Sequence, residues 1–323
     1  MEISDDVLAT MGNTPLVRLS RFSPSGAQLV AKLESFNPGG SVKDRIGVAM
    51  IEAAEARGEL APGDTIVEPT SGNTGLGLAM VAAIRGYRLV CTAASKISNE
   101  KVALLEAFGA EVVVCPADVE ADDPRSYYKV AERLRDEEGA YLPYQYYNQA
   151  NPEAHYRSTG PEIWRQTDGR ITHWVAGIGT GGTISGTARY LKEQNPEVRV
   201  IGVDPVGSVY AYYSEHGELP PAEQITSYLI DGVGEDFLPE TVWWDTIDEV
   251  ITVEDRPAYQ AALELARTEG YFCGSSGGMA VEGARRVAQS LDPEDLVVTL
   301  LPDSGERYLS KFNREWLEER GLS

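Results

Sequence analysis

Short apolar runs rich in β-branched residues recur along the chain, and segments with a helical spacing of apolar residues lie between many of them. Short continuous apolar runs indicate buried strands, whereas apolar positions that repeat every three or four residues indicate helices. Strands that alternate with helices predict an α/β fold with mostly parallel sheets. The expected strands are 29–33, 65–67, 89–92, 112–114, 174–178, 198–203, 250–253 and 296–301. The expected helices are 76–84, 101–108, 130–136, 184–193, 258–268 and 279–291.

The stretch 207–226 is the least regular part of this pattern, because it combines several tyrosines with a Pro-Pro pair. We interpret it as an ordinary surface loop. The alternative is a loop at the mouth of an active site.

The composition describes a large and strongly acidic protein. Its 323 residues, 42% of them hydrophobic, are enough for two domains or for one large α/β domain. The formal net charge is −22, and 21 of the 28 basic residues are arginine. Such a surface repels nucleic acids and anionic membranes, so neither is an expected partner. Many acidic residues with few lysines fit a protein that stays soluble in high salt, although a GC-rich genome also favours arginine over lysine.

No segment indicates export, membrane insertion or metal binding. The N-terminus is acidic and lacks a signal-peptide pattern, and no apolar run is as long as a membrane span. The cysteines, Cys91, Cys115 and Cys273, are odd in number and lack metal-ligand spacing. We therefore expect a cytoplasmic protein without a disulfide framework or a metal ion.

The segment 37–45, which reads N-P-G-G-S-V-K-D-R, is a predicted turn that leads into a helix. It places Lys43 in the first helical turn, where the positive end of the helix dipole disfavours a charged ammonium group. A lysine that forms a Schiff base needs this, because only the neutral amine is nucleophilic. The alternative is a surface lysine within a charged K-D-R triplet.

Two loops at the ends of expected strands have compositions that suit anions, and ligands of α/β proteins bind at such strand ends. Residues 68–75 bring hydroxyl groups, an amide and glycines to the start of a helix, which suits a carboxylate. A turn capped by Ser71 or Asn73 is the alternative. Residues 177–183 combine glycines with two threonines and suit a phosphate, although a dinucleotide loop or a threonine-capped turn is an alternative. The full pattern of an NTP-binding P-loop is absent from them.

Two further loops carry a weaker signal. In 273–278, which reads C-G-S-S-G-G, a serine hydroxyl suits the ring of a cofactor, and a serine-capped turn is the alternative. Residues 301–308 form another loop after an expected strand.

Together these stretches resemble the β-family of pyridoxal-phosphate enzymes, fold type II, and within it the cysteine synthase/cystathionine β-synthase family. The resemblance runs from T-M-G-N-T-P-L-V-R at 10–18 to the C-terminal helix, with the motifs in the expected order. It implies pyridoxal 5'-phosphate as the cofactor and a homodimeric α/β enzyme in which each domain is a mostly parallel twisted sheet flanked by helices. It also implies a smaller mobile domain at 44–145 and a larger cofactor-binding domain made of 1–43 and 146–323.

The resemblance implies roles for individual residues. Lys43 matches the lysine that holds the cofactor covalently and then acts as general base, and Asn73 matches the residue that bonds to the ring hydroxyl of the cofactor. Ser276 matches the serine that faces the pyridine nitrogen. The substrate carboxylate loop corresponds to Thr70, Ser71 and Thr74, and Gln145 matches a glutamine that helps to hold the same carboxylate. The phosphate loop corresponds to Gly179, Thr180, Gly181, Gly182 and Thr183, and further substrate contacts to Gly232 and Glu235.

The implied reaction replaces the β-substituent of L-serine or O-acetylserine with the sulfur of L-homocysteine, by way of an aminoacrylate, and gives cystathionine. D-G-V-G-E-D-F-L-P at 231–239 and L-P-D-S at 301–304 resemble cystathionine β-synthases, whereas G-E-R-Y at 305–308 resembles cysteine synthases. Glu235 stands where animal β-synthases have tyrosine, which leaves both first substrates open. A cysteine synthase that uses sulfide is the alternative, and a non-catalytic ligand-binding homologue is a remote one.

Regulatory features of that family are not expected. We see no Cys- and His-containing extension before Thr10 and no tandem regulatory module after the C-terminal helix, so we expect neither haem control nor activation by S-adenosylmethionine. We expect His155 and His173 to be structural, because the sequence shows no set of partners for them.

Overall fold

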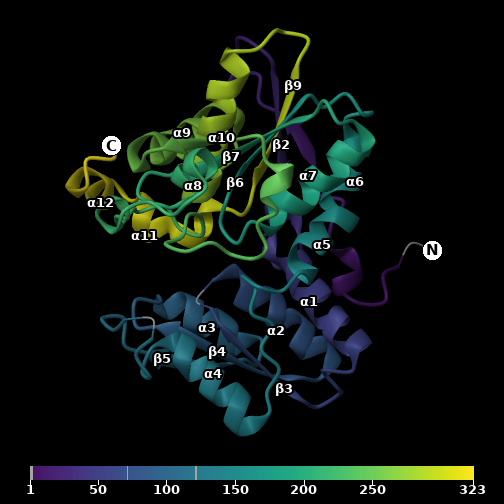
Figure 1. Cartoon of the computed structure of the whole chain (residues 1–323), viewed down its shortest axis with the longest axis vertical. Coiled ribbons are helices and arrows are strands. Elements are labelled where there is room, and N and C mark those ends of the chain that lie inside the picture. Colours follow the sequence, from purple (N-terminus) through teal and green to yellow (C-terminus); the bar gives the residue numbers. More distant parts are fainter. Residues whose placement is uncertain (1–2, 71, 121) are drawn as a thin grey trace. The chain divides into compact units, whose positions relative to one another are not determined.

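The computed structural model describes residues 3–70, 72–120 and 122–323. The chain forms two compact units (Figure 1). The first unit consists of Met1–Met11 and Asn37–Asn151, and the second of Gly12–Phe36 and Pro152–Ser323. Each unit is therefore built from two separate stretches of the chain.

The first unit contains a three-stranded parallel sheet with the strand order β3-β4-β5. β3 and β4 are buried at nearly every position, which explains why their sequences are largely continuous apolar runs rather than alternating ones. The elements of this unit are β3 (Thr65–Pro69), β4 (Arg88–Ala94), β5 (Glu111–Cys115), α1 (Lys43–Arg57), α2 (Asn73–Arg85), α3 (Asn99–Ala107), α4 (Tyr127–Glu138) and the start of α5 (Ala150–Arg157).

Helices α1 and α2 pack closely because two glycines lie where they meet. A Cβ atom on Gly47 would come within 2.7 Å of the carbonyl carbon of Gly77, and one on Gly77 would come within 2.8 Å of the carbonyl oxygen of Lys43. Such distances to backbone atoms are too short for any residue with a Cβ atom, so the approach requires glycine. The contact fixes the backbone of Lys43 relative to α2, the helix that begins at Asn73.

The second unit contains a six-stranded sheet with the order β1-β2-β9-β6-β7-β8, in which only β1 is antiparallel to its neighbour. Its strands are β1 (Leu16–Arg18), β2 (Gln28–Leu33), β6 (His173–Gly177), β7 (Arg199–Pro205), β8 (Glu249–Val253) and β9 (Leu296–Leu301). Its helices are the rest of α5, then α6 (Thr159–Gln166), α7 (Gly182–Gln194), α8 (Tyr210–His216), α9 (Asp255–Glu269), α10 (Ser275–Gln289), α11 (Leu309–Phe312) and α12 (Arg314–Glu319).

Helices cover both faces of this sheet. In Figure 1, α9 and α10 lie on one side of the strands, and α6 and α7 lie on the other. The core between the sheet and the first pair of helices joins residues far apart in sequence, such as Leu29 of β2, Val297 of β9, Leu265 of α9 and Val281 of α10. Removal of these apolar side chains from water is the main favourable contribution to the folding of the unit.

A charged pair lies inside the second unit. Lys32, near the end of β2, has no exposed surface, and its Nζ atom lies 2.7 Å from Oε2 of Glu162. The same Nζ atom donates to the carbonyl oxygen of Thr14 and to Oε1 of Gln166, both at 3.0 Å. The buried ammonium group is thus paired with a charge and bonded to two further acceptors, which a buried charge requires.

The structure confirms the predicted α/β fold with mostly parallel sheets, and each expected strand and helix is present within a few residues of its predicted bounds. β1 was not predicted, because three residues are too few to show an apolar pattern. The interpretation of 207–226 as a surface segment agrees with the structure from residue 214 on, where most residues are exposed, but not at its start. This stretch contains α8, and Tyr210 at its start is fully buried.

The first compact unit includes Lys43, because its second stretch runs from Asn37 to Asn151. Mobility of a domain at 44–145 stays a prediction. Within the described ranges, no helix is long and apolar enough to cross a membrane. The same ranges hold no group of three or more His, Cys, Asp and Glu side chains that could bind a metal ion.

Candidate functional site

The turn before α1 is held by its own side chains. Asp44 is fully buried, and its carboxylate accepts the N–H group of Gly39 at 2.7 Å and the hydroxyl of Ser41 at 3.4 Å. The Ser41 hydroxyl accepts the N–H group of Lys43 at 3.2 Å, and Lys43 is the first residue of α1. The predicted turn, helix and first-turn lysine are therefore confirmed, and short-range bonds fix the backbone from which the Lys43 side chain extends.

The predicted carboxylate loop ends at the N-terminus of α2. Thr70 is buried, and its N–H group bonds to the carbonyl oxygen of Thr92 at 2.9 Å, which ties the loop to β4. Asn73 is the first residue of α2 and Gly72 is its N-cap, so the alternative of an Asn73 cap is wrong. Ser71 lies outside the described residues.

Gln145 meets this loop although it lies far away in sequence. Its side-chain oxygen accepts the hydroxyl of Thr74 at 2.7 Å, and both residues are buried. The backbone of the Gln145 segment is held by Glu68, whose carboxyl group accepts the N–H groups of Tyr144 at 2.8 Å and of Gln145 at 3.2 Å. The first unit therefore joins Thr74 to Gln145, two of the residues that the resemblance assigns to the substrate carboxylate.

Glu68 belongs to this arrangement, although no role was predicted for it. Burial raises the pKa of its carboxyl group to about 7, and the two N–H groups that it accepts offset only part of that rise. A glutamate inside an otherwise apolar strand was the available signal, because a buried carboxyl group needs hydrogen-bond donors nearby.

In the second unit, the predicted phosphate loop turns its carbonyl groups towards the protein. Four consecutive carbonyl oxygens each accept a hydrogen bond, and three of the donors come from outside the loop and α7. The bonds are Gly234 N–H to Ile178 at 2.7 Å, Tyr210 O–H to Gly179 at 2.6 Å, Thr241 O–H to Thr180 at 2.5 Å and Ser185 N–H to Gly181 at 3.0 Å. With its acceptors occupied in this way, the loop suits an anionic ligand beyond the N-terminus of α7.

Two glycines of the loop have no room for a side chain. Gly181 has a φ angle of +85°, and a Cβ atom there would come within 2.2 Å of a methyl group of Val242. A Cβ atom on Gly179 would come within 2.5 Å of the carbonyl oxygen of Gly232. The predicted substrate-contact segment around Gly232 therefore lies directly against the phosphate loop, and the N–H group of Glu235 in that segment bonds to the Ser208 hydroxyl at 3.0 Å.

Ser276 lies in the first turn of α10, in the same unit, and is buried. The neighbouring Ser275 hydroxyl accepts the N–H group of Asp231 at 3.1 Å, which joins the start of α10 to the Gly232 segment. Within the second unit, the structure thus gathers the phosphate loop, Gly232, Glu235 and the α10 N-terminus that carries Ser276.

The three helices that start at predicted binding loops share one feature. Their N-caps are glycines: Gly72 for α2, Gly181 for α7 and Gly274 for α10. Among the described residues, no N-cap side chain therefore bonds to the first turn of these helices. By contrast, α3, α4 and α12 are capped by the side chains of Ser98, Ser126 and Asn313. The alternatives of threonine- and serine-capped turns are therefore wrong, and the positive ends of the three helices suit ligand groups instead.

His155 has partners that the sequence did not reveal. It is buried, its Nδ1 atom lies 2.8 Å from the hydroxyl of Thr159, and its Nε2 atom lies 3.2 Å from the hydroxyl of Thr183. Thr183 belongs to the phosphate loop, so His155 is connected to a predicted binding residue. No sequence signal was available, because α5 and α7 are separated by 24 residues between Arg157 and Gly182.

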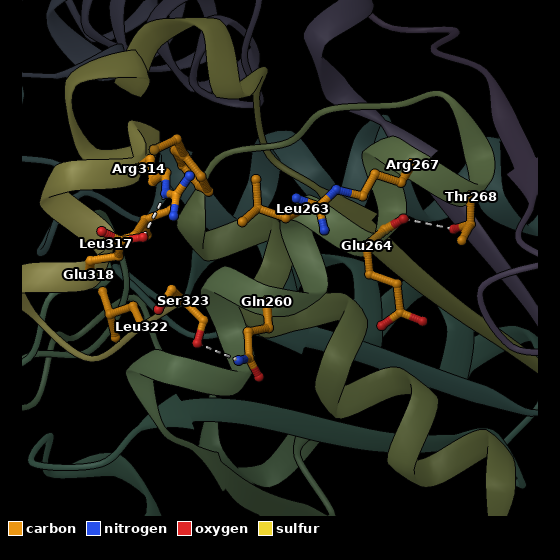
Figure 2. A pocket seen from close by; sticks show the side chains of 11 residues that line it. Gln260, Leu263, Glu264, Arg267, Thr268, Arg314, Leu317, Glu318, Leu322 and Ser323 are labelled. Atoms are coloured by element: carbon orange, nitrogen blue, oxygen red, sulfur yellow. Dashed lines mark hydrogen bonds and ion pairs between the residues drawn. The ribbon is translucent and has the colours of Figure 1, made fainter.

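A pocket of about 630 Å³ lies elsewhere in the second unit, between α9 and the C-terminal segment (Figure 2). Apolar side chains such as Leu263 and Leu322 line it together with charged ones. Arg314 pairs with Glu318 at 2.6 Å across one helical turn, and Gln260 bonds to the carbonyl oxygen of Ser323 at 3.3 Å. Since none of the predicted site residues lines it, this pocket does not belong to the candidate site.

Comparisons with known proteins agree with this arrangement. A family model described as pyridoxal-phosphate dependent enzyme matches residues 7–303. The chain is 46% identical over 326 residues to cystathionine beta-synthase of Rattus norvegicus, and 42% identical over 331 residues to that of Saccharomyces cerevisiae. These alignments cover 99% and 98% of this chain but 57% and 64% of the other proteins, so the chain spans less than two thirds of their length.

The fold of this chain also matches solved structures of enzymes. O-ureido-L-serine synthase superposes with a TM-score of 0.88 at 38% identity, over 96% of this chain and 95% of that one. A hydrogen sulfide-producing enzyme from Fusobacterium nucleatum superposes with a TM-score of 0.86 at 33% identity, over 95% of this chain and 99% of that one.

The residues described above fit pyridoxal phosphate. Gly179 and Gly181 form a backbone cradle that any side chain at either position would disturb, at the uncapped N-terminus of α7. Lys43 supplies a primary amine at the start of a well-anchored helix. With the family match over 7–303 and the structural relatives, this fit shows that the chain belongs to the fold type II family of pyridoxal-phosphate dependent enzymes.

Proposed function

We propose that this chain catalyses a β-replacement that joins L-serine or O-acetylserine to L-homocysteine and forms cystathionine. The observation that carries the proposal is the identity of 42% to 46% with cystathionine beta-synthases of several organisms, over 98% to 99% of this chain. The activity is a proposal because those proteins are longer than this chain. The homologous region contains every predicted site residue, Ser71 included.

Pyridoxal phosphate, when bound, supplies an electron sink that stabilises negative charge on the substrate Cα atom. In our proposal, Lys43 Nζ is the point of covalent attachment and the base that removes the Cα proton and returns it. The anchored turn before α1 supports this assignment, because it restricts the directions from which the amine approaches a ligand.

The first unit would hold the substrate carboxylate. The uncapped N-terminus of α2 has the positive end of a helix dipole, and Thr70 and Thr74 lie beside it. The bond between Thr74 and Gln145, together with Glu68 behind Gln145, would keep these groups in place before substrate arrives. Asn73 would bond to the ring hydroxyl of the cofactor.

The second unit would hold the phosphate and the ring nitrogen of the cofactor, through the phosphate loop and Ser276. A serine hydroxyl favours a protonated ring nitrogen less than a carboxylate does, which makes the electron sink weaker. Expulsion of a β-substituent then becomes the favoured fate of negative charge at Cα. This choice of residue supports elimination and replacement at Cβ.

A second candidate is synthesis of cysteine from an activated serine and sulfide. The structural likeness to a hydrogen sulfide-producing enzyme favours it, because that protein shares the fold at 33% identity. Glu235 bears on this choice, since this partly buried residue lies in the segment against the phosphate loop. A carboxylate there would repel an anionic nucleophile such as hydrosulfide and would attract the ammonium group of homocysteine.

The test is a competition between nucleophiles. Enzyme loaded with pyridoxal phosphate is mixed with serine or with O-acetylserine, and homocysteine or sulfide is then added at equal concentrations. We expect mass spectrometry to detect cystathionine formed faster than cysteine. Formation of cysteine alone would contradict the proposal and favour the second candidate.

The role of Lys43 is tested by Lys43→Ala, with Lys96→Ala at an exposed lysine of the same unit as the control. Borohydride reduction should attach the cofactor to the Lys43 peptide in the wild-type and control proteins, as seen by peptide mass spectrometry. Lys43→Ala should remain folded, lack this adduct and lose at least 10³-fold in turnover, because it lacks both the attachment point and the base (about 10²- to 10⁴-fold for the base alone). An unchanged turnover in Lys43→Ala would refute the assignment.

We also infer a homodimer in the cytoplasm. The resemblance to the family supports the dimer, and the three cysteines, which are buried and free, support a reducing compartment. Light scattering coupled to gel filtration measures the assembly directly, and a mass of one chain would contradict the dimer.

A further inference from the structure

His155 lies between two threonine hydroxyls, and these contacts restrict where its protons are. The residue is 1% exposed, with Nδ1 at 2.8 Å from Thr159 Oγ1 and Nε2 at 3.2 Å from Thr183 Oγ1. A neutral imidazole has one N–H donor and one acceptor nitrogen, and each hydroxyl has a single proton to donate. The direction of the hydrogen bond between Thr159 and the neutral ring therefore determines the direction of the bond between the ring and Thr183.

Two arrangements of the neutral ring satisfy the contacts. In the first, Nε2–H donates to Thr183, and the Thr159 hydroxyl donates to Nδ1. In the second, the Thr183 hydroxyl donates to Nε2, and Nδ1–H donates to Thr159. Only the first leaves the single proton of Thr183 available for another acceptor.

A phosphate group at the α7 N-terminus distinguishes the two arrangements. A phosphate dianion has only acceptor oxygens, so Thr183 contributes a hydrogen bond to it only by donating its proton. In the second arrangement, the lone pairs of Thr183 would face the phosphate oxygens and repel them. The ring is buried, so water cannot screen that repulsion well.

We propose that His155 is a positioning residue for the cofactor phosphate: it carries a proton on Nε2, donates it to Thr183, and so turns the Thr183 hydroxyl proton towards the phosphate. This rests on the proposed binding of the phosphate at the phosphate loop. An imidazolium ring also carries a proton on Nε2 and has the same effect on Thr183. The hydrogen bond between Thr159 and Nδ1 restricts rotation of the ring.

The first test reads the protonation of Nε2 directly. The chain has 3 histidines, so long-range ¹H–¹⁵N spectra of ¹⁵N-histidine-labelled protein are simple, and His155→Gln assigns the signals of His155. With pyridoxal phosphate bound, we expect Nε2 of His155 to carry a proton. An Nε2 nitrogen without a proton in the same sample would overturn the proposal.

The second test separates the phosphate from the rest of the cofactor. The dissociation constants of pyridoxal phosphate and of pyridoxal, which lacks the phosphate, are measured for the wild type and for variants. His155→Leu should weaken binding of pyridoxal phosphate about tenfold or more and change the binding of pyridoxal much less, as expected for loss of a hydrogen bond to a charged group. An equal loss for both ligands would overturn the proposal, because a merely structural role would affect both.

Two other variants test the hydrogen bonds from Thr159 through His155 to Thr183 without removing the imidazole of His155. Thr159→Val removes the partner of Nδ1 and should weaken binding of pyridoxal phosphate less than His155→Leu does, again selectively. His173→Gln is the control, because His173 is bonded to Thr172 in the same unit and does not contact the phosphate loop among the bonds described. A selective loss in His173→Gln equal to that in His155→Leu would contradict a specific role for His155.

These measurements involve no turnover, so they fail independently of the proposed reaction. A protein that prefers pyridoxal phosphate through His155 but makes no cystathionine would support this inference and contradict the proposed activity. A protein that forms cystathionine but has an unprotonated Nε2 on His155 would support the proposed activity and contradict this inference.

Discussion

Glu68 illustrates how one buried residue can hold the backbone beside the predicted carboxylate loop. It lies at the end of β3 with no exposed surface, and its carboxyl group bonds to the N–H groups of Tyr144 and Gln145. Through these bonds it holds the segment that reaches Thr74. Its protonation state therefore affects both the stability of the first unit and the placement of Gln145.

The pKa of Glu68 predicts a pH dependence of stability. Burial raises this pKa from 4.5 to about 7, so between these pH values the folded protein binds a proton that the unfolded chain has released. The free energy of unfolding should then fall by roughly 3 kcal/mol as the pH rises through this window. Outside this pH range, the contribution of Glu68 to the free energy of unfolding should stay nearly constant. Urea unfolding at pH 5, 6 and 7 measures the slope.

Glu68→Gln keeps an acceptor oxygen and does not titrate, so its unfolding free energy should fall less steeply between pH 5 and 7. Asp204 provides a matched residue in the second unit, because burial raises its pKa to about 7 as well. Asp204→Asn should reduce the slope in the same direction, and the double variant should reduce it most. A wild-type slope that both single variants retain in full would contradict this prediction.

At the scale of elements, the α1–α2 contact connects packing to chemistry. Gly47 and Gly77 allow the two helix backbones to approach, and the carbonyl group of Lys43 lies at the same contact. The turn bonded through Asp44 then fixes the start of α1. Helix packing therefore positions the backbone of Lys43, the residue that we propose as the attachment point of the cofactor.

Gly77→Ala should disturb this contact. The added methyl group would meet the carbonyl oxygen of Lys43 at 2.8 Å, and overpacking of this kind costs about 1–3 kcal/mol, partly offset by the higher helix propensity of alanine, about 0.5–1 kcal/mol. We expect lower stability in urea and a smaller yield of the borohydride adduct at Lys43. Ile84→Ala, at a 40% exposed position of α2, is the control and should leave the adduct yield unchanged. Equal adduct yields in both variants would contradict the expected shift of α1.

Three helices, α2, α7 and α10, begin with a glycine N-cap instead of a capping side chain. Gly72, Gly181 and Gly274 occupy cap positions that serine or asparagine fill in α3, α4 and α12. A capping side chain would use the same N–H groups that an anionic ligand needs. The absence of a cap at these three helices therefore favours binding over local stability.

At the scale of the whole molecule, the dominant property is its charge. A net charge of −22 over 323 residues implies substantial repulsion in the folded state, and salt screens such repulsion. Surface ion pairs have the opposite dependence on salt. One example is Arg88, which lies 2.7 Å from both Glu111 and Glu138.

We expect the repulsion to dominate, so the midpoint of thermal unfolding should rise from dilute buffer to about 1 M KCl, where the screening length is about 3 Å. Activity should be retained under the same conditions. Calorimetry at several KCl concentrations, with sucrose as a non-ionic control, measures the effect. A midpoint that falls steadily with KCl, together with loss of activity, would contradict adaptation to salt.

The sequence by itself determined the α/β fold, the order of most elements, the turn that leads into Lys43 and the charge of the molecule. These features depend on residues close together in the chain, where apolar spacing, glycines and helix-start patterns act directly. The same local patterns did not reveal that 207–226 has a buried start and a short helix. A buried tyrosine on a short helix within a loop has no distinctive local pattern.

Only the tertiary structure decided which distant residues support the predicted ones. Glu68 meets Gln145 across 77 positions, Tyr210 meets Gly179 across 31, and His155 meets Thr183 across 28. Each of these bonds depends on how strands and helices pack, because packing brings a donor within reach of an acceptor that no local pattern can specify. The local sequence thus indicated the candidate binding loops, and the packing of the elements decided how the backbones of those loops are held.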